Sequence, residues 1–306
     1  MGSEMNGDGP RVLIPLDGSA LSAWALDRVS GLLARMGATA TLLGVVEEPA
    51  ADLAFRVDPR HAEVAAALGA QRDRLIGKGV SAQAELRFGD PAEAILREIG
   101  EGGHRLVAMS THGRTGLARV LFGSVAAKVL RGSAIPALLF RPMQAPDGTL
   151  SPAESREPVD VRRVLVLLDG SPLSEEILAP AVDLARRLGA ELRLFTAVDR
   201  EALARAAEER LDDWSGRISA GGVATSIDVR HGAAATEAME AAREWGADLV
   251  ALTTHGRTGA ARALVGSVAE RILRDDTAGP LLVLRSRILA GAVVPGPEAG
   301  PVVHVT

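Results

Sequence analysis

The chain has 306 residues, 47% of them hydrophobic and 24% charged, which suits two domains of about 150 residues each. A formal net charge of −5 argues against a broad nucleic-acid interface, which needs a basic face. Cysteine is absent, which excludes disulfides, thiolate catalysis and cysteine-ligated zinc. The N-terminus lacks the pattern of a signal peptide, and no apolar run reaches the roughly 18 residues of a membrane span. We therefore expect a cytoplasmic protein without membrane contact.

Short apolar runs alternate with longer segments of helical periodicity in the first half of the chain. Gly37 follows the first helical segment, where glycine supplies the left-handed conformation that ends a helix. The pattern predicts strands over 12–16, 41–46, 83–88, 106–109 and 137–140, with helices over 22–36, 60–78 and 91–101 and from residue 124 onward.

The second half shows the same alternation. The pattern predicts strands over 164–168, 191–198, 225–230, 249–252 and 281–284, with helices over 174–188, 200–220 and 236–245 and from residue 267 onward. Strands that alternate with helices form a mostly parallel sheet covered on both faces. The sequence therefore predicts an α/β protein with two tandem, doubly wound, Rossmann-like domains, each built on a five-stranded parallel sheet.

Two internal matches show that the chain is a duplication. Residues 11–38 and 163–190 share 14 of 28 positions, and residues 111–131 and 254–274 share 15 of 21. We place the two domains at 10–142 and 161–287. The segment 143–160 is rich in Pro, Ser and acidic residues and is typical of a linker. The tail 288–306 is predicted to be irregular, with a weak strand pattern at 302–305.

A glycine-rich loop follows the fourth predicted strand of each domain. It carries Gly113, Gly116, Gly123 and Ser124 in the first domain, and Gly256, Gly259, Gly266 and Ser267 in the second. Glycines let several backbone N–H groups point at one anion, and a helix N-terminus favours phosphate. The sequence contains neither a Walker loop nor the dinucleotide fingerprint of the first βα turn. Either the loop binds phosphate, or the glycines only close a tight turn; repetition at fixed spacing favours phosphate.

Catalytic and metal-binding interpretations find less support. His112 and His255 precede the glycines, but no acid–base partner or nucleophile recurs beside them, which favours a role in loop packing. The six histidines show no helical i, i+4 pairing. We therefore predict neither a catalytic residue nor a metal ligand.

These motifs resemble the universal stress protein family in its tandem two-domain form. ATP-binding members of that family carry the pattern G-x2-G-x9-G-[S/T] after the fourth strand. Gly113, Gly123 and Ser124 match its later positions, as do Gly256, Gly266 and Ser267 in the second domain. Ser110 and Thr253 replace the first glycine, and the β-branched Thr253 would crowd a ligand more.

The resemblance implies an adenine nucleotide alpha hydrolase-like fold with strand order 3-2-1-4-5, and ATP, with Mg²⁺, as the ligand. It assigns nucleoside contacts to Asp17 and Asp169, and the adenine wall to Val45 and Ala197. Pro15 completes the first-strand motif. Arg114 and Arg257 either screen the phosphates or are solvated loop residues. An aspartate after a strand also suits a helix-entry turn, which is compatible with nucleoside contact.

The resemblance favours an ATP-binding protein of the stress response that acts by nucleotide-dependent regulation and not as an enzyme. Two alternatives stay open: a scaffold that binds no nucleotide, which Ser110 and Thr253 favour, and a weak ATP hydrolase. The apolar runs at 137–140 and 281–284 would form exposed edge strands unless another strand pairs with them. We therefore expect the two domains to pair through these strands, with homodimerisation left open and no nucleic-acid partner.

Overall fold

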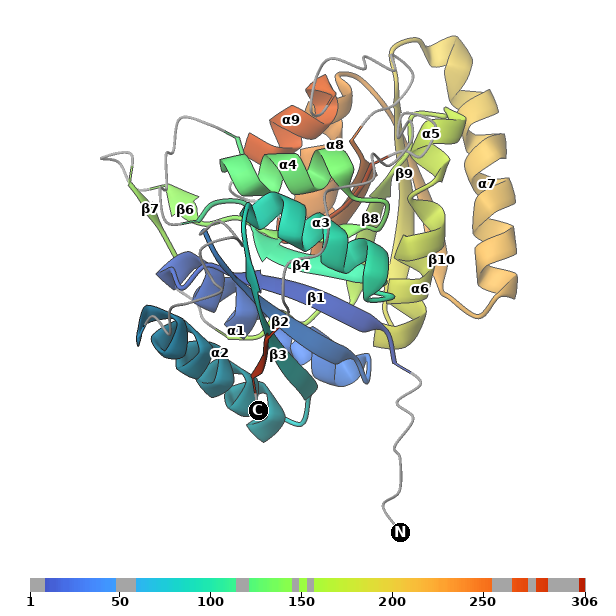
Figure 1. The fold of residues 1–306 in the computed structure, drawn as a ribbon. Helices are drawn as coiled ribbons and strands as arrows, with labels where there is room; N and C mark the ends of the chain where they lie inside the picture. The colour runs from blue at the N-terminus through green and yellow to red at the C-terminus, as the bar shows by residue number, and fades with distance from the viewer. Residues whose placement is uncertain are drawn as a thin grey trace. The chain divides into compact units, whose positions relative to one another are not determined.

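The computed structural model describes residues 9–47, 59–113, 121–144, 149–152, 157–254, 266–274, 279–285 and 303–305. The chain divides into two compact units, shown in Figure 1. The first unit takes in Met1–Ile135, Pro142–Val159 and Val294–Thr306, and the second takes in Pro136–Arg141 and Asp160–Val293. The last strand of the first repeat thus belongs to the second unit, and the C-terminal segment belongs to the first.

The first unit is built on a parallel sheet in the order β3-β2-β1-β4. A further strand, β13 (Val303–Val305), pairs antiparallel with β3, so the weak strand pattern at 302–305 marks a real edge strand. The parallel strands are β1 (Arg11–Leu16), β2 (Thr39–Val46), β3 (Ser81–Phe88) and β4 (Leu106–Ser110). Their central residues are buried, as the continuous apolar runs predicted.

Helices cover both faces of this sheet. They are α1 (Ala20–Arg35), α2 (Pro59–Gly77), α3 (Pro91–Glu101) and α4 (Ser124–Gly132). In Figure 1, α1 and α2 lie on one face, and α3 lies with α4 on the other. Gly37 has φ +60°, which confirms the predicted left-handed end of the first helix.

Regular structure occurs within the described part of the predicted linker, 143–160. Strands β6 (Met143–Gln144) and β7 (Leu150–Ser151) form a short antiparallel pair. Val159 is buried, and its N–H donates to the carbonyl of Arg28 over 2.8 Å. Burial of two apolar side chains, Val159 and Val161, explains why this stretch does not behave as a simple polar linker.

The second unit repeats the design with the parallel order β10-β9-β8-β11-β12. The strands are β8 (Arg163–Leu167), β9 (Glu191–Val198), β10 (Thr225–His231), β11 (Leu249–Thr253) and β12 (Leu281–Leu284). A sixth strand, β5 (Ala137–Phe140), pairs antiparallel with β12, Leu138 opposite Leu282. Each unit therefore has a mixed, mostly parallel sheet, as the alternation of strands and helices predicted.

The helices of the second unit are α5 (Pro172–Glu175), α6 (Leu178–Leu188), α7 (Ala204–Ala220), α8 (Ala234–Trp245) and α9 (Ser267–Arg274), with a 3-10 turn, η2 (Glu201–Leu203), before α7. The prediction of one helix over 174–188 is wrong, because the helix is interrupted between the end of α5 and the start of α6. Pro180 has no N–H to donate to the carbonyl of Glu176, and its ring crowds that carbonyl.

The α/β class and its tandem repetition are confirmed by the element order of both units. Within the described ranges, no helix is long and apolar enough to cross a membrane.

Candidate functional site

Two segments far apart in the sequence meet where β1 and β4 end. The two strands are parallel neighbours, with Val12 opposite Leu106. Asp17 follows β1, and Gly113 follows β4 three residues after its end. A Cβ atom added to Gly113 would overlap Oδ2 of Asp17, so the two residues are in direct proximity. This is the crevice at the carboxyl ends of the strands where open α/β sheets bind ligands.

Asp17 is held by the turn that starts α1. Its Oδ1 atom accepts a hydrogen bond from the N–H of Ser19 over 2.9 Å. The Ser19 hydroxyl in turn accepts from the N–H of Ser22 over 3.2 Å and caps the helix. One carboxylate oxygen thus fixes the turn, while the other lies toward Gly113.

The start of α4 provides a backbone cradle. Gly123 is its N-cap residue with φ −62° and ψ 159°, and no side chain caps it within the part of the chain that the structure describes. The Gly123 N–H donates to the carbonyl of Thr111 over 2.9 Å. Gly123 and Ser124 line the crevice, and a Cβ added to Gly123 would contact backbone atoms of Thr111 and His112 at 3.6 Å. The first turn of the helix therefore borders the crevice, the arrangement that favours an anion.

Three buried side chains pack the start of the loop: Ser110, Thr111 and His112. The Ser110 hydroxyl accepts from the N–H of His112 over 3.3 Å, and Thr111 Oγ1 lies 3.0 Å from His112 Nδ1. Ser110 thus holds the loop backbone, a role that the glycine it replaces could not have.

The surrounding residues line a cleft of about 180 Å³ that is partly open to solvent. Seven of the predicted site residues line it together: Pro15, Asp17, Val45, Ser110, Gly113, Gly123 and Ser124. The sequence did not indicate Pro91 and Ile95 of α3 or Met109, which also line it. In the sequence, these three residues fit the apolar pattern of a helix or a strand, which predicts burial in the core and not a place in a binding site.

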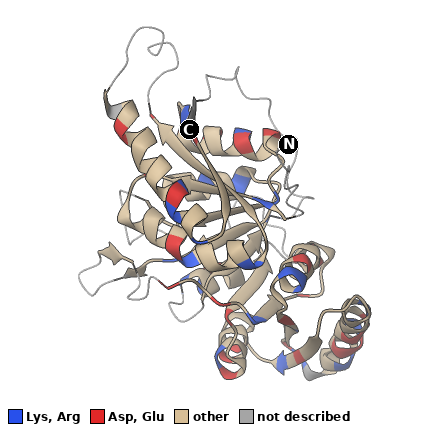
Figure 2. Cartoon of the chain, turned by 90° about the horizontal axis from the view of Figure 1, so that it is seen from below, with Lys and Arg blue, Asp and Glu red and all other residues tan. Residues whose placement is uncertain are grey.

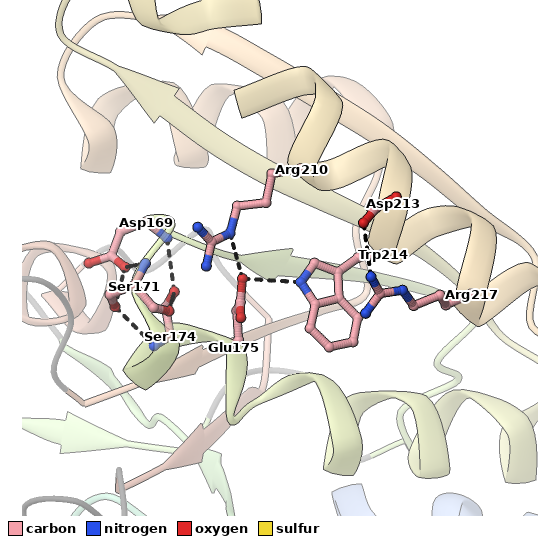
Figure 3. A network of polar contacts seen from close by, with 8 residues as sticks. All are labelled: Asp169, Ser171, Ser174, Glu175, Arg210, Asp213, Trp214 and Arg217. Atoms are coloured by element: carbon pink, nitrogen blue, oxygen red, sulfur yellow. Dashed lines mark hydrogen bonds and ion pairs between the residues drawn. The ribbon is translucent and has the colours of Figure 1, made fainter. Parts of the chain in front are cut away.

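The second unit contains an equivalent cleft of about 200 Å³. Asp169 Oδ1 accepts from the N–H of Ser171 over 2.9 Å and from its hydroxyl over 2.6 Å, as Figure 3 shows. The N–H of Gly266 donates to the carbonyl of Thr254 over 2.6 Å. Five predicted site residues line this cleft: Asp169, Ala197, Thr253, Gly266 and Ser267.

The two clefts differ in the side chains that narrow them. Phe195 stands in the second cleft where Leu43 stands in the first, and the buried Thr253 stands in place of Ser110. Bulkier side chains thus line the second cleft, although its volume is no smaller than that of the first. Arg114, Gly116, Gly256 and Arg257, which the sequence also pointed to, lie outside the described residues.

Charged groups help to hold α3 beside the first cleft. The Asp90 carboxylate caps α3 by accepting from the N–H groups of Ala92 and Glu93, each over 3.0 Å, and it pairs with Lys128 over 3.0 Å. Burial opposes the charge, but the bonds from Lys128 and the two N–H groups outweigh it and lower the pKa of Asp90. Acidic and basic residues are also interspersed along other helices (Figure 2). On α7, for example, they form i, i+4 ion pairs.

A sequence profile described as "Universal stress protein family" matches residues 10–141 and 160–285. The chain belongs to this family. Universal stress protein Rv2005c of Mycobacterium tuberculosis (strain ATCC 25618 / H37Rv) is 30% identical over 222 residues, 67% of this chain and 70% of that protein. Universal stress protein YxiE of Bacillus subtilis (strain 168) is 29% identical over 145 residues, 43% of this chain and 98% of that protein.

A solved structure agrees with the fold of this universal stress protein. The crystal structure of a universal stress protein from Archaeoglobus fulgidus DSM 4304 matches with a TM-score of 0.66 and 21% identity. The match covers 90% of this chain and 98% of the other. Tandem repetition of the domain is thus shared with known proteins.

Proposed function

We propose that this universal stress protein binds ATP in the first cleft, and more weakly in the second, and responds by a change of conformation or assembly. The observation that carries the proposal is the start of α4, which has no side-chain cap among the described residues and lines the same cleft as Asp17. A phosphate group needs N–H donors, and a ribose needs an acceptor for its hydroxyls. Both kinds of group line this one cleft.

Most of the predicted site residues have a role in this proposal. The N–H groups at Gly123 and Ser124 would hold phosphate oxygens, and Asp17 would accept from the ribose. Val45 and Pro15 give the base an apolar wall. Arg114, with Mg²⁺ brought by the nucleotide, would offset the roughly four negative charges of ATP. In the second unit Asp169, Ala197, Gly266 and Ser267 would act in the same way, with Gly256 and Arg257 as loop partners.

We further propose that the protein works in the cytoplasm as two domains, 10–142 and 161–287, held together by their last strands. The antiparallel ladder of β5 and β12 supports this pairing. The competing function is a scaffold that binds no nucleotide. Thr253 favours it for the second unit, because a buried β-branched side chain lines that cleft.

Calorimetric titration of the purified protein with ATP and Mg²⁺ tests the proposal. We expect one binding event of higher affinity, assigned to the first cleft, and a weaker one. Mass spectrometry of freshly purified protein under native conditions checks for retained nucleotide. Absence of heat and of retained nucleotide at millimolar ATP would instead favour the scaffold. Light scattering with and without ATP then measures whether assembly responds.

A further inference from the structure

A second groove opens beside the first cleft, between α1 and α2. It measures about 210 Å³. Four residues at or near the ends of β1 and β2 line both hollows: Leu16, Asp17, Ser22 and Val45. The two hollows therefore adjoin each other around the end of β1, and a ligand in the cleft can extend into the groove.

The lining of the groove is mostly apolar. Ala23 of α1 faces Val64, Ala67 and Leu68 of α2 across it. The Gln71 amide and the Ser19 hydroxyl add polar groups. Val64 keeps 36% of its surface exposed, so the groove leaves an apolar wall open to solvent. An apolar slot with a few polar groups suits a planar heterocyclic ring.

The second unit carries different residues at the equivalent positions. Strand register sets the equivalence, because Thr225 lies opposite Leu192 as Ala82 lies opposite Ala40. Ala23, Ala67 and Gln71 then correspond to Glu175, Arg210 and Trp214. Three residues that leave space in the first unit are thus replaced by two charged side chains and an indole.

These three side chains bridge α5 and α7, as Figure 3 shows. Arg210 Nε lies 2.7 Å from Glu175 Oε1, and Trp214 Nε1 donates to the same oxygen over 3.1 Å. Arg217 stacks over the Trp214 ring at 5.1 Å and pairs with Asp213 over 2.9 Å. The hydrogen bond that Arg210 donates to Glu175 is also the main cause of the raised pKa of Arg210. The network spans the space that corresponds to the groove.

We propose that the first cleft and its groove together bind a dinucleotide, two bases joined through bridging phosphates, whereas the second cleft accepts a mononucleotide only. This rests on the proposed nucleotide function. The cradle at α4 supplies the phosphate contacts, one base lies in the cleft, and the groove supplies a second apolar slot. Asp17 lines both hollows, where its carboxylate would accept from the ribose hydroxyls while the bridging phosphates stay at the cradle.

The test compares diadenosine tetraphosphate with ATP. Calorimetry uses the full chain carrying Gly266→Val, which fills the second cradle and leaves the first cleft as the reporter. Burying one face of a second base, roughly 60 Å² of apolar surface, predicts an affinity about tenfold higher for the dinucleotide. The triple variant Ala23→Glu/Ala67→Arg/Gln71→Trp copies the network of the second unit. It should remove the preference for the dinucleotide while the affinity for ATP stays within about twofold.

A converse variant keeps the test informative if the triple variant folds poorly. In a Gly123→Val background, Glu175→Ala/Arg210→Ala/Trp214→Gln should give the second cleft a dinucleotide preference that it lacks. If ATP binds but the dinucleotide binds no more tightly, or the triple variant keeps the preference, the groove is not a second base site. If neither ligand binds the first cleft, the proposed function fails, and this inference fails with it.

Discussion

Glu98 lies at the centre of a buried ionic cluster in the first unit. It is 3% exposed, and its Oε1 atom lies 2.8 Å from Nε2 of His104. Its other oxygen accepts from Arg87, a second buried charge. Burial alone would raise the pKa of Glu98, but the bond from His104 and the charge of Arg87 lower it.

Glu98→Gln should therefore destabilise the fold by about 3 kcal/mol at neutral pH, because Arg87 loses its closest buried carboxylate and keeps only the more distant Glu85 and Glu101. Since the pKa of Glu98 is lowered on folding, this contribution is fully present above the ordinary value of 4.5 and is lost as the pH falls through the folded value. Urea unfolding at several pH values measures it: the gap between wild type and variant should shrink in acid. Glu101→Gln, at a carboxylate that is 57% exposed, is the control and should cost under about 0.5 kcal/mol. A gap that widens in acid would contradict this assignment.

The sequence predicts individual residues well where a local backbone rule applies, and less well where the tertiary structure decides. The strand order that the family resemblance implied puts β1 beside β4. Asp17 and Gly113, which follow these two strands, are therefore expected at the same edge of the sheet. Pro91 and Ile95 could not be assigned to the cleft, because which helix face borders a cavity depends on packing. The hydrogen bond from the His112 N–H to the Ser110 hydroxyl could not be predicted from the sequence either.

At the scale of elements, capping signals decide how well a helix can be predicted. α3 has the predicted bounds, because Asp90 accepts from two N–H groups and Pro91 occupies the first helical position. The break before α6 was missed because its apolar periodicity continues through residues 174–188, and only the missing N–H of Pro180 interrupts it. Periodicity identifies the helical face, but single residues set the ends.

Asp90→Ala should lower the free energy of unfolding by about 1 kcal/mol, because two N–H groups at the start of α3 lose their acceptor. Chemical denaturation measures the change. Asp183→Ala removes an exposed i, i+4 partner of Arg187 and should cost only about 0.3 to 0.5 kcal/mol. Equal effects of the two substitutions would mean that the cap contributes no more than a surface ion pair.

At the scale of the molecule, the duplication could be detected from the sequence, but not how the chain divides into units. The sequence indicated that both last strands need cover, and β5 and β12 provide it for each other. Which compact unit β5 joins depends on the total of its contacts, and these place Pro136–Arg141 with the second unit. The repeat boundary and the packing boundary therefore differ by one strand.

A substitution in the first repeat should consequently weaken the second unit. Leu138 is fully buried on β5, opposite Leu282 of β12. Leu138→Ala should cost about 2 to 5 kcal/mol and speed hydrogen exchange of the β12 amides. Leu203→Ala, at a side chain that is 37% exposed, serves as control and should leave β12 protected. Unchanged exchange in β12 with Leu138→Ala would show that β5 does not stabilise this strand.

The most direct measurement compares two pairs of glycine substitutions by calorimetric titration with ATP and Mg²⁺. Gly123→Val with Gly266→Val places side chains in both cradles, where an added Cβ meets no atom closer than 3.4 Å, so the fold should tolerate them. Gly77→Val with Gly216→Val, at positions with no atom within 4 Å of an added Cβ, is the matched control. The account predicts that the first pair weakens ATP binding by at least about 100-fold, while the control stays within about twofold of wild type. Wild-type affinity in the first pair would contradict the claim that these helix starts hold the phosphates.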